Sequence, residues 1–133
     1  MPTMRRLFEG PHHPAARGRA LVLRFAVVQM LAASVIALGM GVFSGWTAVH
    51  AALAGGGVVA VGNVIFGWRL FAPGVAPAAQ IARAMWLGEG LKWLWVVLAV
   101  WLALTTADLA PLPFLLGLVA AQVGFWLGIA FLR

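Results

Sequence analysis

No charged side chain occurs in residues 25–68, FAVVQMLAASVIALGMGVFSGWTAVHAALAGGGVVAVGNVIFGW. A soluble surface cannot stay uncharged over such a length, and the whole chain of 133 residues is 64% hydrophobic and only 9% charged. The hydrocarbon core of a bilayer is about 30 Å thick, so about 20 helical residues are needed to cross it. Because lipid cannot satisfy backbone N–H and C=O groups, these residues are expected to cross the membrane as helices.

Short segments with turn chemistry divide the apolar sequence. Residues 43–46, Phe-Ser-Gly-Trp, interrupt the uncharged run near its middle, and Trp46 suits a membrane interface. The prolines of residues 72–77 cannot continue a helix, and residues 105–111 form a further break that ends in a proline. The sequence therefore predicts an all-α integral membrane protein built as two helical hairpins. Its expected transmembrane helices are residues 21–43, 47–71, 79–104 and 112–132.

The arginines predict how the chain is oriented in the membrane. They all fall on one side of the four expected helices, whereas the other side carries only Asp108. Because cytoplasmic loops carry an excess of Lys and Arg, we expect both termini in the cytoplasm and a location in the bacterial inner (cytoplasmic) membrane. Residues 1–18 are expected to form a flexible basic cytoplasmic arm, and residues 19–133 the membrane domain. The arginines are Arg5, Arg6, Arg17, Arg19, Arg24, Arg69, Arg83 and Arg133.

The sequence argues against several classes of function. It has no cysteine, no glycine-rich phosphate loop with a lysine, and no nucleophile paired with a base, so we expect no enzyme activity. The net charge of +6 is attributed to topology, and no nucleic-acid partner is expected. His12 and His13 are interpreted as solvated residues rather than metal ligands. The tryptophans are expected mostly to face lipid or the interface; they include residues 86, 93, 95, 101 and 126.

Glu89 and Lys92 are the only charged residues deep inside an expected helix. Ionisable groups in the hydrocarbon are costly, and a spacing of three residues places both on one helix face, where they can pair. Two interpretations stay open from the sequence: a structural ion pair, or a site that contacts a partner within the membrane.

Amides extend this polar region to the other expected helices. Asn63 and Glu89 each lie six residues from the nearest arginine, which places both about 9 Å inside the arginine level, as neighbours across a hairpin. Buried amides usually form hydrogen bonds between helices, and a transport path would in addition need access for water. The predicted polar layer consists of Gln29, Asn63, Glu89, Lys92 and Gln122.

A row of small residues predicts close helix packing. Its members are Gly56, Ala60, Asn63 and Gly67, with a 4-3-4 spacing that lets another helix approach closely. The segment 79–104 offers a row with matching spacing, so the two helices are expected to form a tight hairpin.

The second hairpin resembles the bacterial ATP synthase subunit I family, whose members are short four-span proteins associated with the F-type ATP synthase. The resemblance is carried by residues 62–69, GNVIFGWR, and residues 87–92, LGEGLK, with Gln29 and Gln122 at similar places. It covers roughly residues 20–133. The sequence departs from the family pattern at Gly62, where a proline is expected before the Asn, and this difference concerns how sharply the helix bends.

The resemblance implies an accessory protein that assists assembly or stability of the membrane rotor, the ring of c subunits, through helix contacts within the membrane. It thereby links the chain to ATP synthesis and proton transport, with the c subunits and the lipid bilayer as expected partners and no cofactor. For some relatives a role in Mg²⁺ or Ca²⁺ transport has been proposed, so the alternative is a small divalent-cation transporter that uses Glu89 as a metal ligand. A generic membrane anchor for another partner is a third interpretation.

Overall fold

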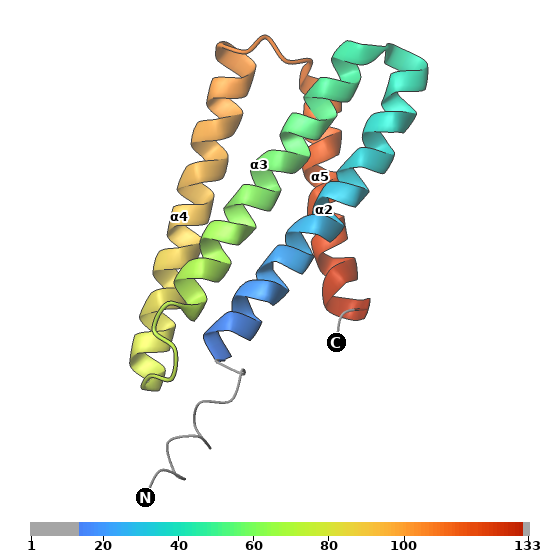
Figure 1. Ribbon diagram of the computed structural model, residues 1–133. Helices are drawn as coiled ribbons and strands as arrows, with labels where there is room; N and C mark the ends of the chain where they lie inside the picture. The colour runs from blue at the N-terminus through green and yellow to red at the C-terminus, as the bar shows by residue number, and fades with distance from the viewer. Residues whose placement is uncertain (1–13, 132–133) are drawn as a thin grey trace, which may run out of the picture.

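The computed structural model describes residues 14–131 and folds them into four helices. These are α2 (Pro14–Ser44), α3 (Trp46–Phe71), α4 (Ala78–Thr105) and α5 (Pro111–Phe131), which run up and down as a bundle (Figure 1). Each helix is long and apolar enough to cross a membrane. The predicted all-α fold with four membrane-crossing helices is therefore confirmed.

The helices end at short segments that contain glycine or proline. Gly45 alone separates α2 from α3, and its φ of 80° lies in the left-handed region that favours glycine. Residues 72–77 join α3 to α4 through Pro73 and Gly74, and residues 106–110 join α4 to α5. Pro111 opens α5, where the N–H that proline lacks would have no partner within the helix.

α2 begins about two turns earlier than the predicted residue 21. Its first residue is Pro14, whose ring fixes φ at a helical value, and the next two residues are alanines, the strongest helix formers. Residues 14–18 of the predicted flexible arm are therefore helical. The rest of that arm lies outside the described residues, as does the end of the chain; these parts include Arg5, Arg6, His12, His13, Leu132 and Arg133.

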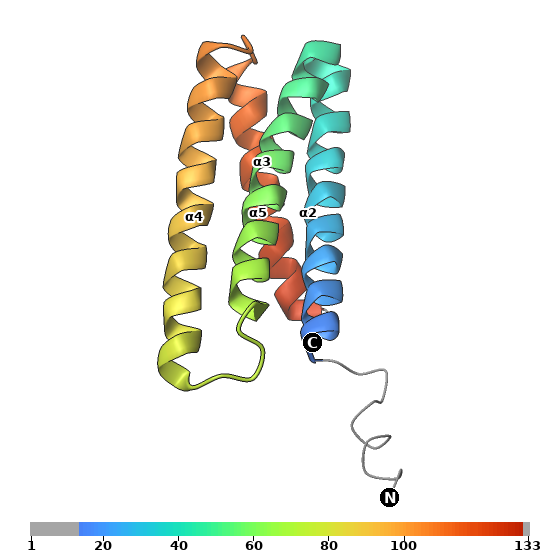
Figure 2. The same cartoon turned by 60° about the vertical axis from the view of Figure 1, so that its left-hand side comes forward.

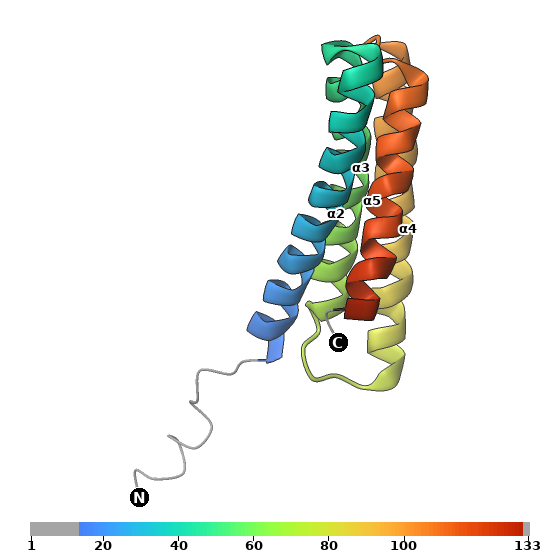
Figure 3. The same ribbon diagram turned by 90° about the vertical axis from the view of Figure 1, so that its right-hand side faces the viewer.

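Three of the helices form the packed centre of the bundle. α2, α3 and α5 pack against one another, whereas α4 packs along α3. Figure 2 shows α4 at one side of the bundle, and Figure 3 shows α3 between α2 and α5. α3 is therefore the central helix, and α4 is peripheral.

Glycine permits the closest approach in this centre. A Cβ added at Gly55 would meet the backbone carbonyl of Phe114, and one added at Gly117 would meet that of Ala52. No side chain fits at either glycine, so the backbones of α3 and α5 are in direct contact. Such contacts between small residues hold membrane helices together where lipid removes the hydrophobic driving force.

The small-residue row of α3 packs against α2, and the prediction that it faces the helix of residues 79–104 is wrong. A Cβ added at Gly56 would touch Ala33, and one added at Gly67 would touch Val22. α4 instead covers Gly62, which lies on a different face of α3. Residue spacing defines which side chains share a helix face, but the rotation of the helix in the bundle decides which neighbour covers it. The row of Gly56, Ala60, Asn63 and Gly67 is buried throughout.

The two ends of the bundle differ in charge. The start of α2, the 72–77 loop and the end of α5 lie together at one end (Figure 1), which we call the arginine end. The described arginines all lie in the helix turns toward this end; they are Arg17, Arg19, Arg24, Arg69 and Arg83. The turn at Gly45 and the loop with Asp108 lie at the opposite end, which we call the Asp108 end.

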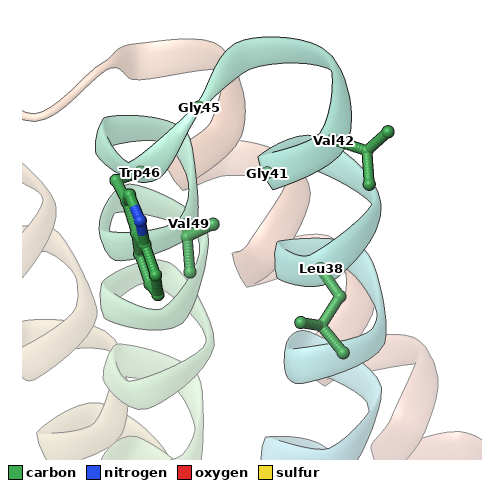
Figure 4. Close-up of a pocket in the computed structure, with 6 residues that line it drawn as sticks. All are labelled: Leu38, Gly41, Val42, Gly45, Trp46 and Val49. Carbon is green, nitrogen blue, oxygen red and sulfur yellow. The ribbon is translucent and has the colours of Figure 1, made fainter.

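A shallow pocket of about 290 Å³ lies at the Asp108 end, against the turn between α2 and α3 (Figure 4). Val49 points from α3 toward Gly41 of α2, where an added Cβ would be 2.6 Å from the Val49 Cγ2. None of the residues that line the pocket is ionisable, so the functional site is sought elsewhere; they are Leu38, Gly41, Val42, Gly45, Trp46 and Val49.

Candidate functional site

The charged pair of α4 forms the centre of the candidate site. The Lys92 Nζ lies 3.8 Å from the Glu89 Oε1, one helical turn away. The same Oε1 accepts a hydrogen bond of 2.9 Å from the Trp93 indole N–H. The two charged side chains differ in cover, because 40% of Glu89 but only 14% of Lys92 is exposed. The acid is therefore the accessible member of the pair.

Lys92 lies against the hairpin partner α3. Its Cγ would be 3.4 Å from a Cβ added at Gly62, so the aliphatic part of the side chain packs over this glycine. Its Nζ lies 5.9 Å from the ring centre of Phe66 and 5.7 Å from that of Trp93. Rings at these distances attract a cation through their quadrupoles. The carboxylate and the aromatic faces together compensate the charge of Lys92.

A cavity of about 270 Å³ opens beside Glu89 in the seam between α3 and α4. Phe66 of α3 lines it together with Met85, Trp86 and Glu89 of α4. Toward the Asp108 end, Ala103 of α4 belongs to a buried cluster with Ala51 of α3 and Phe114 of α5. The accessible carboxylate thus lies beside an open part of this seam.

Asn63 and Gln29 lie elsewhere, in the packed centre formed by α2, α3 and α5. The Gln29 side chain is fully buried and Asn63 is 7% exposed, and neither amide has a hydrogen-bond partner within the described residues. Asn63 lines a separate cavity of about 160 Å³ with Phe25, Phe66 and Phe125. Asn63 and Glu89 therefore make no contact through hydrogen bonds, although the sequence places them at similar depth. Phe66 lines both cavities and lies between the two polar groups.

Gln122 completes the set of predicted polar residues. It is half-buried on α5, and no hydrogen bond of its side chain is found among residues 14–131. The structure thus brings Glu89 and Lys92 together on α4 and leaves the three amides apart from them. The predicted polar residues therefore do not form one hydrogen-bonded network among the described residues.

The comparison with known families decides which group of proteins the chain belongs to. The family model described as ATP synthase I chain matches residues 24–119. The chain belongs to this family. The matched range contains Gln29, Asn63, Glu89 and Lys92, whereas Gln122 lies beyond it. No curated protein and no solved structure gives a match.

Membership of the ATP synthase I chain family confirms the resemblance seen in residues 62–69 and 87–92. The family is an accessory and not a catalytic part of the ATP synthase, so the chain has an accessory role and associates with that complex. Together with four helices of membrane-crossing length, it identifies a multi-pass membrane protein. Gly62, the departure from the family pattern, lies within an uninterrupted α3.

Two tryptophans of this family member have roles that sequence reasoning missed. Trp93 binds the Glu89 carboxylate, and the Trp95 indole N–H donates a hydrogen bond of 2.9 Å to the backbone carbonyl of Val58 on α3. The spacing of four residues from Glu89 to Trp93 was a usable signal, because side chains four apart meet on a helix. The bond of Trp95 crosses the hairpin, so no local spacing could predict it.

The described residues hold no group of three or more His, Cys, Asp or Glu side chains that could bind a metal ion. Glu89 is the one carboxylate at this depth within residues 14–131, and its Oε1 is already engaged by Trp93 and Lys92. The site therefore consists of an ion pair whose accessible member is Glu89, with the aromatic rings of Phe66 and Trp93 beside it.

Proposed function

We propose that this protein assists assembly or stability of the c ring of the F-type ATP synthase, and that α4 makes the contact within the membrane. The observation that carries the proposal is the position of the ion pair. Glu89 and Lys92 lie on the peripheral helix, and the acid is accessible beside a cavity.

The burial of α4 supports its use as a contact surface. Of the residues in the most apolar 18-residue stretch of each helix, only 11% are buried inside the protein in α4, against 44% in α3. Its exposed surface carries large aromatic side chains such as Trp86 and Trp93, at 74% and 57% exposure. Aromatic residues are enriched where proteins bind one another, since they bury much area with little loss of conformational freedom.

The ion pair supplies specificity for a partner in the membrane. The resemblance implies that c subunits carry a carboxylate within the bilayer, and an unpaired carboxyl group there is costly. Lys92 is only 14% exposed, so in this proposal its side chain turns outward from α3 to meet an incoming carboxylate, while Glu89 retains the Trp93 indole as its donor. Asn63 faces α2 and α5, so the proposal assigns the contact to the ion pair and not to this predicted partner-binding residue. The proposed role is to shield the partner's carboxylate before the ring closes.

Affinity purification of the tagged protein from native membranes tests the proposal. We expect c subunits to co-purify with the wild type, and the double substitution Glu89→Leu with Lys92→Leu to reduce their recovery several-fold. Gly39→Leu is the matched control, because a Cβ added at Gly39 meets no atom within 4 Å and the residue lies on α2. Full recovery of c subunits with the double variant would contradict a role for the ion pair.

We also propose that the protein resides in the bacterial inner membrane with both termini in the cytoplasm. The excess of arginines at the arginine end supports this orientation, since cytoplasmic segments are enriched in Lys and Arg. The chain has no cysteine, so single cysteines can be labelled cleanly. We expect Gly74→Cys to be labelled from the cytoplasmic side and Asp108→Cys from the opposite side; the reverse would refute the orientation.

Divalent-cation transport is the alternative proposal and has a separate test. Mg²⁺ is usually held by several oxygen ligands and waters, and the site supplies one accessible carboxylate, Glu89. A transporter should move Mg²⁺ into liposomes that contain this protein alone, and Glu89→Gln should abolish the flux. An assembly protein should show no flux in either form.

A further inference from the structure

An apolar groove runs between α2 and α3 on the side of α3 that α4 and α5 leave open. It has a volume of about 400 Å³ and continues into a neighbouring depression over α2. α4 covers α3 at Gly62 and α5 covers it at Gly55, whereas Val61 and Trp68 of the groove are 44% and 58% exposed. The lining residues include Gly57, Val61, Val64 and Trp68 of α3 and Ala26 and Met30 of α2.

The length of the groove matches one leaflet of a bilayer. Gly57 lies near the middle of α3, and Trp68 lies one turn from its end at the arginine end. With a rise of 1.5 Å per residue, the groove extends about 16 Å along the helix. One leaflet contributes about half of a hydrocarbon core that is about 30 Å thick. A partner helix that crosses the membrane has about 20 residues in the hydrocarbon and would instead be expected to make contact through both leaflets.

Charge and aromatic character mark the end of the groove at the interface. Arg19 precedes Leu23 by four residues and Ala26 by seven, so these three residues share one face of α2. Leu23 and Ala26 line the depression that continues the groove, and Arg19 is exposed beyond them at the arginine end. Trp68 lies opposite on α3, at the level where indole rings favour the headgroup region.

We propose that this groove binds an anionic phospholipid, with one acyl chain between α2 and α3 and the phosphate held by Arg19. The apolar walls suit a chain of methylene groups, and the guanidinium beyond them suits a phosphate. Gly57 and Ala26 provide the room, because larger side chains there would occupy the space of the acyl chain. The lipid fills the seam between α2 and α3 on the face opposite the centre formed with α5. This inference does not depend on the proposed role in c-ring assembly.

Native mass spectrometry of the detergent-purified protein with added phosphatidylglycerol or phosphatidylcholine tests the site. We expect one phosphatidylglycerol to stay bound about fivefold more tightly than phosphatidylcholine, and Arg19→Gln to remove this preference, as one arginine near a headgroup supplies roughly that factor. Gly57→Leu should abolish retention of either lipid, because Gly57 lines the groove and a Cβ added there meets no atom within 4 Å, which leaves the new side chain room to enter the groove. Gly39→Leu should behave as the wild type.

Three outcomes would overturn the proposal. Equal retention of both lipids by the wild type would show that the site does not select an anionic headgroup. Undiminished lipid binding by Gly57→Leu, with c subunits still recovered, would place the lipid elsewhere. Loss of c subunits from Gly57→Leu with lipid retention unchanged would identify the groove as a helix-docking surface. Arg19 is exposed, so Arg19→Gln is expected to fold normally. Its effect on lipid preference therefore tests the site even if Gly57→Leu folds poorly.

Discussion

α3 and α4 are neighbouring helices of similar length and apolar character, yet they hold opposite positions in the bundle. α3 contacts every other helix, whereas α4 contacts α3 along its length. α3 carries glycines at its closest contacts, and α4 carries tryptophans, of which Trp86 and Trp101 are largely exposed. Lipid is as apolar as a protein core, so hydropathy does not determine which helix is central and which is peripheral. Side-chain size determines it, because small residues let helix backbones meet and large residues occupy the outer surface.

The largest expected effect comes from filling a contact of the central helix. Gly117→Leu places a side chain on the backbone of Ala52, so α5 must move away from α3. We expect a loss of about 3 kcal/mol in the free energy of unfolding, measured by denaturant titration in detergent. Gly90→Leu on α4 is the control, because a Cβ added at Gly90 meets no atom within 4 Å, and it should change stability little. Equal losses of stability in both variants would contradict the view that α3 is tightly packed and α4 is peripheral.

A smaller effect of opposite sign is expected at Asn63. Its amide is buried and has no hydrogen-bond partner among residues 14–131, and a cavity beside it leaves room for an apolar side chain. Asn63→Leu should therefore stabilise the protein by about 1 kcal/mol in the same titration. Gln122→Leu, at a half-buried position, should shift stability less. A loss of stability in Asn63→Leu would show that a molecule other than the chain, such as water, satisfies the amide.

The smallest effect concerns the attachment of α4 to α3. Trp95→Phe keeps the aromatic ring but removes the donor to the Val58 carbonyl. Hydrogen bonds between membrane helices contribute about 0.6 kcal/mol on average, and we expect a loss of this size. Trp101→Phe provides the comparison, since Trp101 is 59% exposed on the same helix. If both substitutions had the same effect, the bond across the hairpin would contribute nothing specific.

Much of the fold follows from local sequence, and the arrangement of the site follows only in part. The breaks at Gly45, at residues 72–77 and before Pro111 depend on backbone chemistry within a few residues, so they were predictable. The pairing of Glu89 with Lys92 depends on spacing within one helix and was predictable for the same reason. The face of α3 that meets α2 depends on how whole helices rotate against one another. Spacing alone cannot settle that rotation, so Asn63 was expected beside Glu89 and lies on another face of α3.

The ion pair has a consequence for how α4 can move. Glu89, Lys92 and the indole that binds the carboxylate all belong to this one helix. Arg83, the other charged residue of α4, lies toward the arginine end, so the part of the helix around the pair can enter the hydrocarbon, or separate from a neighbour, with its charges balanced. Leaving α3 would break the bond from Trp95 to Val58 and the contact of Lys92 with Phe66, but it would expose no unpaired charge. α4 can therefore exchange one apolar neighbour for another at small electrostatic cost.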